Sequence, residues 1–196
     1  MRILSWNTAG RPSRVGQQVE AIGQRKVNVV CLQEVRRSTR DGLRDGLRAF
    51  GLIHAVDSLS LLGDAGLTKA SRQTGEFIAS RWPLRKLNCA DVPWPEKTLS
   101  VVVESPTAEV EVHTVHVPPG SSNGWTKIHT FNGIFRHLAH ATAIARILCG
   151  DFNSPQRETA DENEKVKHFR LHGEPPVTRF CIILKTAVRG FALRDK

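Results

Sequence analysis

Several polar residues stand at the ends of apolar runs that have the character of β-strands. They are Asn7, Glu34, His116 and the pair Asp151 and Asn153. Layered α/β folds assemble their sites at strand ends, because the strands give rigidity and the following loops give access. Asp151 and Asn153 are two residues apart, so in an extended segment their side chains point to the same side. These positions are the candidates for a shared functional site.

The chemistry that this set suggests is the binding of a hard cation. Glu34 and Asp151 offer carboxylates, and Asn7 and Asn153 offer amide oxygens. Such a set suits Mg²⁺ or Mn²⁺, which complete their coordination with water and with phosphate oxygens of a substrate. Each residue also has an ordinary explanation, since Asn and Asp are common turn formers and a lone Glu is usually a surface charge. The recurrence of the same context at distant places in the chain favours the site.

The elements that must position these residues can be predicted from hydrophobic periodicity. The chain begins strand, helix, strand, helix, which is typical of mixed α/β layers. Short strands separated by turn-rich stretches follow, as in antiparallel sheets, before a long helix and another strand. The predicted strands cover residues 3–6, 27–32, 53–56, 77–80, 84–88, 99–104, 110–117 and 146–149, and the predicted helices cover 14–26, 38–50 and 125–145.

The segment after residue 156 has a different character. Residues 158–167 are strongly charged and are interpreted as a solvated helix, a Pro-Pro pair at 175–176 breaks the chain, and 180–184 is interpreted as one strand. Residues 1–196 together are predicted to form a single domain, with 157–196 as a divergent tail.

Composition narrows the class of protein. No apolar run approaches the ~20 residues of a membrane span, and residues 1–7 are too short and too polar for a signal peptide. We therefore expect an intracellular, cytoplasmic, soluble protein with no membrane partner. With 28 Lys and Arg against 19 Asp and Glu, the net charge of +9 favours a polyanionic partner, most simply DNA. No protein partner is indicated, and a monomer is expected. The four cysteines are widely spaced, which favours buried thiols over zinc ligands or disulfides.

Two of the motifs that carry the polar residues are specific. Leu32-Gln33-Glu34 ends the second predicted strand, and Gly150-Asp151-Phe152-Asn153 follows the strand at 146–149. Segments 3–10, 75–83 and 115–120 accompany them in a fixed order. Together these segments resemble the endonuclease/exonuclease/phosphatase superfamily, which includes exonuclease III, apurinic/apyrimidinic endonucleases, DNase I, sphingomyelinases and inositol phosphatases.

This resemblance implies a fold and a role for each candidate. The implied fold is a four-layer α/β/β/α sandwich of two mixed sheets flanked by helices, here shortened at its C-terminal edge. Asn7 and Glu34 resemble the family's divalent-metal site, with Glu34 as direct ligand. Asp151 resembles the residue that activates the attacking water, and Asn153 one that orients the phosphate, both beside the metal. His116 takes the place of a His or Tyr that contacts the scissile phosphate.

The departure from the family lies at the C-terminus. Members end the catalytic domain with an Asp-His pair, and this chain contains no such dipeptide. The segment 190–196 resembles the approach to that pair, with Asp195 in the place of the acidic residue and Lys196 in the place of the His. The chain is accordingly either a variant that works without that His or a weakened or inactive relative.

Other residues are predicted to contact the substrate or the core. Arg81 and Lys127 are candidate phosphate contacts. Trp82, Trp94 and Trp125 have the chemistry to stack on bases, although core packing or loop anchoring is favoured for each.

Taken together, the sequence and the resemblance predict a Mg²⁺- or Mn²⁺-dependent DNA phosphodiesterase. The resemblance points to a 3′→5′ exonuclease like exonuclease III, with abasic-site endonuclease activity as a further expectation. One alternative is a phosphodiesterase or phosphatase of the same fold acting on a non-nucleic substrate. The other alternative is a catalytically degenerate DNA-binding protein.

Overall fold

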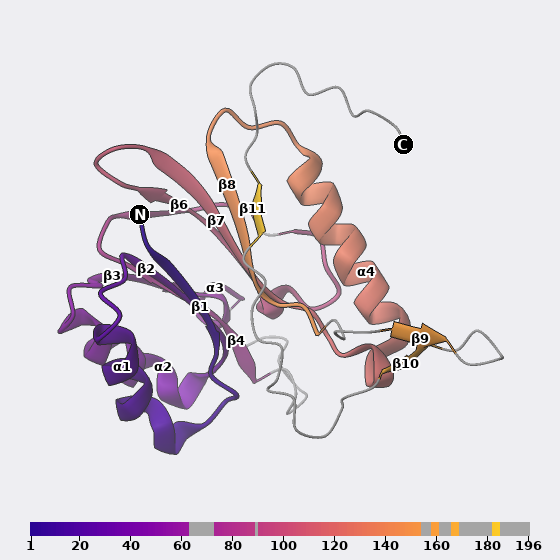
Figure 1. Ribbon diagram of the computed structural model, residues 1–196, viewed down its shortest axis with the longest axis horizontal. Helices are drawn as coiled ribbons and strands as arrows, with labels where there is room; N and C mark the ends of the chain where they lie inside the picture. The colour runs from indigo at the N-terminus through magenta and orange to yellow at the C-terminus, as the bar shows by residue number, and fades with distance from the viewer. Residues whose placement is uncertain (63–72, 89, 154–157, 161–165, 169–181, 185–196) are drawn as a thin grey trace.

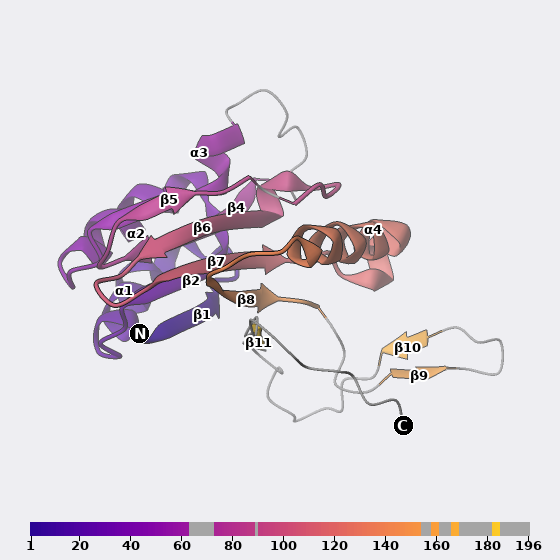
Figure 2. The same ribbon diagram turned by 90° about the horizontal axis from the view of Figure 1, so that it is seen from above.

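The chain folds into four layers, with helices outside and two sheets inside (Figures 1 and 2). The computed structural model describes residues 1–62, 73–88, 90–153, 158–160, 166–168 and 182–184. Helices α1 and α2 cover the outer face of the first sheet, and helix α4 covers the outer face of the second. This is the α/β/β/α sandwich that the family resemblance implies. None of the helices in the described part of the chain is long and apolar enough to cross a membrane.

The first sheet has the strand order β1-β2-β4-β3. Parallel pairing of β1 with β2 sets Ile3 opposite Val29 and Asn7 opposite Gln33, while β4 runs antiparallel to β2 and β3. The carboxyl ends of β1 and β2 therefore lie at one edge of the sheet. The bounds are β1 (Ile3–Asn7), β2 (Val29–Arg36), β3 (His54–Asp57) and β4 (Thr74–Ser80).

The second sheet repeats the parallel pair. Its strand order is β11-β8-β7-β6-β5, and β7 runs parallel to β8, with His116 opposite Asp151 at their carboxyl ends. Strands β5, β6 and β11 are antiparallel to their neighbours. The bounds are β5 (Leu84–Lys86), β6 (Thr98–Glu104), β7 (Glu109–His116), β8 (Ala145–Asp151) and β11 (Ile182–Leu184).

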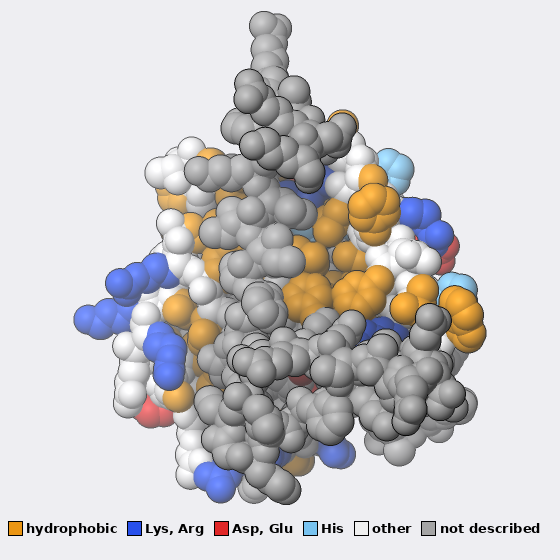
Figure 3. Space-filling view, turned by 45° about the vertical axis from the view of Figure 1, so that its right-hand side comes forward, with side chains coloured by type: hydrophobic (Ala, Val, Ile, Leu, Met, Phe, Trp, Pro, Cys, Tyr) orange, Lys and Arg blue, Asp and Glu red, His pale blue; other side chains and the backbone are white. Residues whose placement is uncertain are grey.

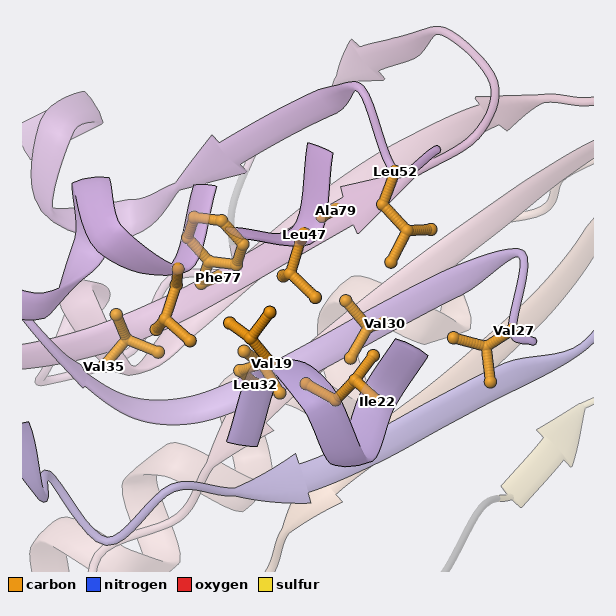
Figure 4. Close-up of a cluster of buried hydrophobic side chains, with 11 residues drawn as sticks. Val19, Ile22, Val27, Val30, Leu32, Val35, Leu47, Leu52, Phe77 and Ala79 are labelled. Atoms are coloured by element: carbon orange, nitrogen blue, oxygen red, sulfur yellow. The ribbon is translucent and has the colours of Figure 1, made fainter. Parts of the chain in front are cut away.

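Helices α1 (Val15–Gly23) and α2 (Arg37–Arg48) fold over the first sheet because each has an apolar stripe at helical spacing. A 3₁₀ turn, η1 (Pro12–Arg14), leads into α1. The stripes meet the outward side chains of β2 and β4 in a core that Figure 4 shows in close-up. This core contains Val19, Ile22, Leu43 and Leu47 from the helices and Val30, Leu32, Phe77 and Ala79 from the strands.

The space between the sheets is filled by the alternate residues of the same strands. On β2, Val30 and Leu32 face the helices, whereas Val29 and Cys31 face the second sheet. Cys31 and Cys149 lie in this core as buried thiols, as the sequence predicts for them. Other members of the inter-sheet core are Ile78, Leu99, Val101, Val103, Val110 and Val112.

Helix α4 (Gly120–Ala139) is kinked at Gly124, where φ is 33°, and packs on the second sheet through Ile134. The predicted helix ran to residue 145, but it ends six residues earlier, where His140 turns extended. The guanidinium of Arg146, from β8, donates to the carbonyls of Leu138 and His140 at 2.7 and 3.0 Å. These bonds satisfy carbonyls that a helix end leaves without partners.

Two parts of the sequence prediction are corrected. The segment 158–167 is not a helix where it is described, because β9 (Glu158–Ala160) and β10 (Val166–His168) form an antiparallel pair. A charged segment has no apolar stripe to hold a helix against a core, and strand pairing satisfies its backbone instead. The short helix α3 (Ser58–Leu62) was not predicted, and Asp57 caps it by accepting from the Ser60 amide at 2.7 Å.

Candidate active site

Four strand ends meet at one edge of the sandwich. The carboxyl ends of β1 and β2 bring Asn7 and Glu34 together, and those of β7 and β8 bring His116 and Asp151 together. Because both parallel pairs end at the same edge, residues 144 apart in sequence touch. The structure thus assembles the predicted strand-end residues in one place.

Asn7 lies between the two carboxylates of the site. Its Nδ2 donates to Glu34 Oε1 at 2.9 Å and to Asp151 Oδ2 at 2.7 Å. Its Oδ1 accepts from the Ala9 amide at 2.8 Å, which fixes the orientation of the side-chain amide. The amide of Asn7 therefore holds together a carboxylate from each sheet.

Glu34 reaches the site through a distorted strand. It has a φ of 58°, and the pairing of β2 with β4 shifts register between Leu32 and Val35. A bulge of this kind turns a side chain out of the regular alternation. The hydroxyl of Thr8 accompanies the bulge by contacting the carbonyls of Gln33 and Glu34 at 2.9 and 3.2 Å. Non-glycine residues in the left-handed region are strained, and such strain is common at functional sites.

Asp151 and Asn153 form a tight turn after β8. The Asn153 amide nitrogen donates to Asp151 Oδ1 at 2.9 Å, and Asn153 itself has a φ of 47°. Its side-chain Nδ2 donates to the Val117 carbonyl at 2.7 Å and lies 3.2 Å from His116 Nε2. Asn153 is therefore locked against the end of β7, facing the imidazole.

His116 completes the cluster from the second sheet. Its Nε2 lies 3.6 Å from Glu34 Oε1, and its side chain is 13% exposed. Burial lowers the pKa of His116, with the charge of Lys97 adding to this effect and the carboxylates of Glu34 and Asp151 opposing it. The imidazole is therefore neutral at physiological pH, with a nitrogen lone pair available to a cation or a proton.

The donor atoms of the cluster fit a divalent metal. Oxygens of Glu34 and Asp151 and a nitrogen of His116 all lie within 4.8 Å of one another. The two carboxylates suit Mg²⁺ or Mn²⁺, and the neutral imidazole beside them favours Mn²⁺ of the two, because Mg²⁺ prefers oxygen ligands alone. Asn7, already bound to both carboxylates, is the neighbouring amide.

A second polar group lies in the interior close to this cluster. The Thr114 hydroxyl donates to Glu76 Oε2 at 2.9 Å and accepts from Gln33 Nε2 at 2.8 Å. Burial raises the pKa of Glu76 well above its ordinary value, although the charge of Lys97 partly opposes the rise. Lys97 is 3% exposed and donates to the Thr74 carbonyl and hydroxyl at 2.8 and 2.6 Å.

Solved structures of known proteins share this architecture. An endonuclease/exonuclease/phosphatase from Beutenbergia cavernae matches with a TM-score of 0.57 and 22% identity over 84% of this chain and 50% of its own. An AP endonuclease from Archaeoglobus fulgidus gives 0.62 and 19%, over 80% and 59%. The chain has the endonuclease/exonuclease/phosphatase fold. Sphingomyelinase C from Streptomyces griseocarneus, with 0.55 and 17% over 79% and 65%, has this fold as well.

The endonuclease/exonuclease/phosphatase fold is what these comparisons establish. Neither protein-family models nor curated protein sequences give a match to the chain. The chain spans about half to two thirds of the length of the three matched structures. An AP endonuclease and a sphingomyelinase act on different substrates, so the fold alone leaves the substrate open.

Within this fold, the two predicted phosphate contacts lie in different places. Lys127, on α4, is 9% exposed, and its Nζ donates to the Asn153 carbonyl at 3.0 Å, which places it beside the cluster. Arg81 follows β4, which runs antiparallel to β2, and its Nε donates to the Val27 carbonyl at 3.2 Å near the start of β2. The structure therefore places Arg81 at the edge opposite the candidate site. Asp195 lies outside the described residues.

Trp125 and two interior polar residues depart from the prediction. Trp82 packs partly buried in the inter-sheet core, but Trp125 is 76% exposed, so the core reading is wrong for Trp125. Sequence reasoning missed Glu76 and Lys97, both buried near the site. A signal was available for Glu76, because a carboxylate beside the apolar run Phe77–Ile78 is unusual in a buried strand.

Proposed function

We propose that the chain is a divalent-metal-dependent phosphodiesterase. The observation that carries this proposal is the convergence of Glu34, Asp151 and His116 within 4.8 Å at the carboxyl ends of strands from both sheets. A purely structural explanation of these residues does not require two carboxylates and an imidazole to meet at one edge. The fold supports the same reaction class, because matched proteins with this fold include an AP endonuclease and a sphingomyelinase.

In this proposal each residue has a defined part. Glu34 and Asp151 would hold the metal, and Asn7 would keep the two carboxylates together through its Nδ2. The metal would neutralise phosphate charge and lower the pKa of bound water. Asp151 aligns the attacking water opposite the leaving oxygen. His116 would lie against the metal, as its place in the donor set requires, and with Asn153, whose Nδ2 is 3.2 Å from His116 Nε2, it would contact the scissile phosphate and stabilise the charge that develops there. Lys127 fixes the backbone of Asn153.

The proposed substrate is DNA, cleaved by a 3′→5′ exonuclease that also cuts at abasic sites. The net charge of +9 supports a polyanionic substrate over a lipid or inositol phosphate. Figure 3 shows the face that carries α4, where hydrophobic side chains lie among Lys, Arg and His side chains. On this helix the exposed Trp125 ring lies 6.2 Å from the His129 ring, a pair suited to stacking on an unpaired base.

Hydrolysis of defined DNA substrates tests the reaction. Linear duplex, closed circular and abasic-site DNA are incubated with Mg²⁺, Mn²⁺ or EDTA. Loss of the linear duplex but not the circle indicates an exonuclease, and cutting at the abasic site indicates the endonuclease activity. Glu34→Gln and Asp151→Asn are expected to lower the rate by about 10²-fold or more, because they remove groups that bind the metal and position water. Glu109→Gln is the matched control, since Glu109 is an exposed carboxylate bonded to Arg85. Activity that survives EDTA, or that both site substitutions leave intact, refutes the metal mechanism.

Binding without turnover separates DNA from the alternatives. A labelled single-stranded oligonucleotide is titrated in EDTA at two salt concentrations. A DNA enzyme loses affinity steeply with salt, and Trp125→Ala is expected to weaken binding about tenfold because a stacked base is lost. Phe135→Ala is the control. Phe135 is as exposed as Trp125, but it lies further along α4 from Lys127, the residue of that helix that contacts Asn153. Tight binding without cleavage favours the degenerate DNA-binding alternative. Hydrolysis of a small phosphodiester without DNA binding favours a non-nucleic substrate.

A further inference from the structure

A strip of buried polar side chains connects the two sheets behind the candidate site. Thr114, on β7, is its centre, because its hydroxyl donates to Glu76 Oε2 on β4 and accepts from Gln33 Nε2 on β2. Gln33 Nε2 also lies 3.2 Å from Ser5 Oγ on β1. These four residues are the polar strip, and they join three strands of the first sheet to one strand of the second.

The polar strip stands in register with the residues of the site. Ser5 precedes Asn7 by two residues and Thr114 precedes His116 by two, so each pair of side chains faces the same way along its strand. Gln33 directly precedes Glu34, and its carbonyl accepts from Thr8. Any shift of one sheet against the other would move the strip and the site together.

Stability alone gives little reason for this strip. Glu76 is 0% exposed, and its Oε1 has no hydrogen-bond partner among the described residues. A buried carboxyl with an unsatisfied oxygen is costly, and well-packed apolar residues in such positions are often neutral or stabilising. The residues of the inter-sheet core, such as Ile78 and Leu99, show that this space accepts apolar side chains.

We propose that the polar strip positions the two halves of the metal site, with Glu76 and Thr114 as its positioning residues. This inference rests on the proposed function. The hydrogen bonds fix the distance and register of β7 against β2 and β4, and so hold His116 at its separation from Glu34. Apolar contacts fill the same space but do not specify register, whereas hydrogen bonds between named atoms do. Residues that orient metal ligands in this way change metal affinity by about 10- to 100-fold when they are lost.

Comparing stability with Mn²⁺ affinity tests the inference. Glu76→Leu replaces the carboxyl-bearing side chain with an apolar one of similar size. Glu76→Gln removes the charge but keeps an oxygen that can accept from the Thr114 hydroxyl. Ser100→Ala is the control, because the buried Ser100 hydroxyl contacts His113 Nδ1 at 2.9 Å in the second sheet, outside the strip. Urea unfolding gives the stability, and calorimetric titration with Mn²⁺ alone gives the affinity.

The expected results separate the two quantities. Glu76→Leu keeps the unfolding midpoint at or above that of the wild type but lowers Mn²⁺ affinity about tenfold, and Glu76→Gln restores most of the affinity. Ser100→Ala lowers the midpoint and leaves the affinity unchanged. Should Glu76→Leu not fold, Thr114→Val cuts the strip at its centre and Thr114→Ser keeps the hydroxyl, so only the valine variant should lose affinity.

Three outcomes overturn the proposals in distinguishable ways. Mn²⁺ affinities of Glu76→Leu and Thr114→Val within twofold of the wild type refute the role of the strip, while the proposed reaction stands. A wild-type protein that binds no Mn²⁺ refutes the proposed function and the strip's role with it. Mn²⁺ binding that depends on the strip, in a protein that cleaves no phosphodiester, refutes only the proposed function.

Discussion

Replacing Gly150 with alanine tests the backbone that carries Asp151. Gly150 has a φ of +142°, and a Cβ added there would lie 1.9 Å from the carbonyl oxygen of Val115. Cβ atoms essentially never come closer than 3.0 Å to such a neighbour, so β8 must move by about 3.0 − 1.9 = 1.1 Å away from β7. The obstacle is backbone on the paired strand, and no side-chain rotation relieves it.

The size of the expected loss in the free energy of unfolding follows from the conformation of Gly150 and from the pairing of β8 with β7. An alanine in this region of φ and ψ costs about 1–3 kcal/mol. The displacement also weakens the parallel pairing in which Gly150 stands opposite Val115, at about 1 kcal/mol for each hydrogen bond lost. We expect Gly150→Ala to lower the free energy of unfolding by about 3–5 kcal/mol. In the protein that remains folded, moving Asp151 by about 1 Å should lower the rate of the proposed phosphodiester hydrolysis about 10²-fold.

Urea unfolding followed by circular dichroism measures the stability change. Gly16→Ala is the matched control, because Gly16 lies in α1 and an added Cβ has nothing within 4 Å. Replacing a helical glycine with alanine raises stability by about 0.5–1 kcal/mol, so the two variants should move in opposite directions. A Gly150→Ala protein within about 1 kcal/mol of the wild type in stability would refute the reasoning.

Two further predictions concern pH and the cationic residues. Burial, followed by the charge of His137, lowers the pKa of His113 from 6.5 to about 4, so below pH 6.5 the unfolded chain takes up a proton that the folded chain does not. The free energy of unfolding should therefore fall by up to about 3 kcal/mol between pH 6.5 and pH 4. Urea titrations at several pH values measure this dependence, and His113→Asn should flatten it. An equal dependence on pH in the wild type and in His113→Asn contradicts the prediction. Lys127→Gln removes the charged donor to the Asn153 carbonyl and should lower turnover of a small phosphodiester about tenfold, whereas Arg81→Gln at the opposite edge should leave it unchanged; equal losses contradict the placement.

The strand ends were predictable because their signal is local. An apolar run such as 29–32 predicts a buried strand, and a polar residue directly after it stands at the end of that strand. The crossover helix between β1 and β2 predicts parallel pairing, which brings Asn7 and Glu34 to one edge. Hydrophobic periodicity therefore predicted the order of the strands and helices and the first half of the candidate site, whereas the four-layer sandwich was implied by the family resemblance.

Residues whose role depends on a distant partner could not be placed in the same way. Gln33 and Thr114 are 81 residues apart, and Thr114 and Glu76 are 38 apart, so no local pattern joins them. Arg81 was expected at the site because its segment belongs to a familiar motif. Arg81 follows β4, and β4 runs antiparallel to β2. The end of β4, and Arg81 with it, therefore lies away from the carboxyl ends of β1 and β2.

Unusual backbone conformations are a further feature that the sequence does not predict. Among the described residues, four that are not glycine have positive φ, and two of them are Glu34 and Asn153. Asn adopts a left-handed conformation more readily than most residues that are not glycine, but Glu rarely does, so the sequence gives no sign of this conformation at Glu34. The bulge in β2 and the turn after β8 therefore place strained backbone under residues that carry the proposed chemistry. Glu76 lies buried close to them, and one of its carboxyl oxygens has no hydrogen-bond partner among the residues that the structure describes. Like the two strained residues, it lowers local stability relative to an ordinary residue. Strain and unsatisfied polarity that concentrate around one cluster are best explained by the geometry that the cluster needs.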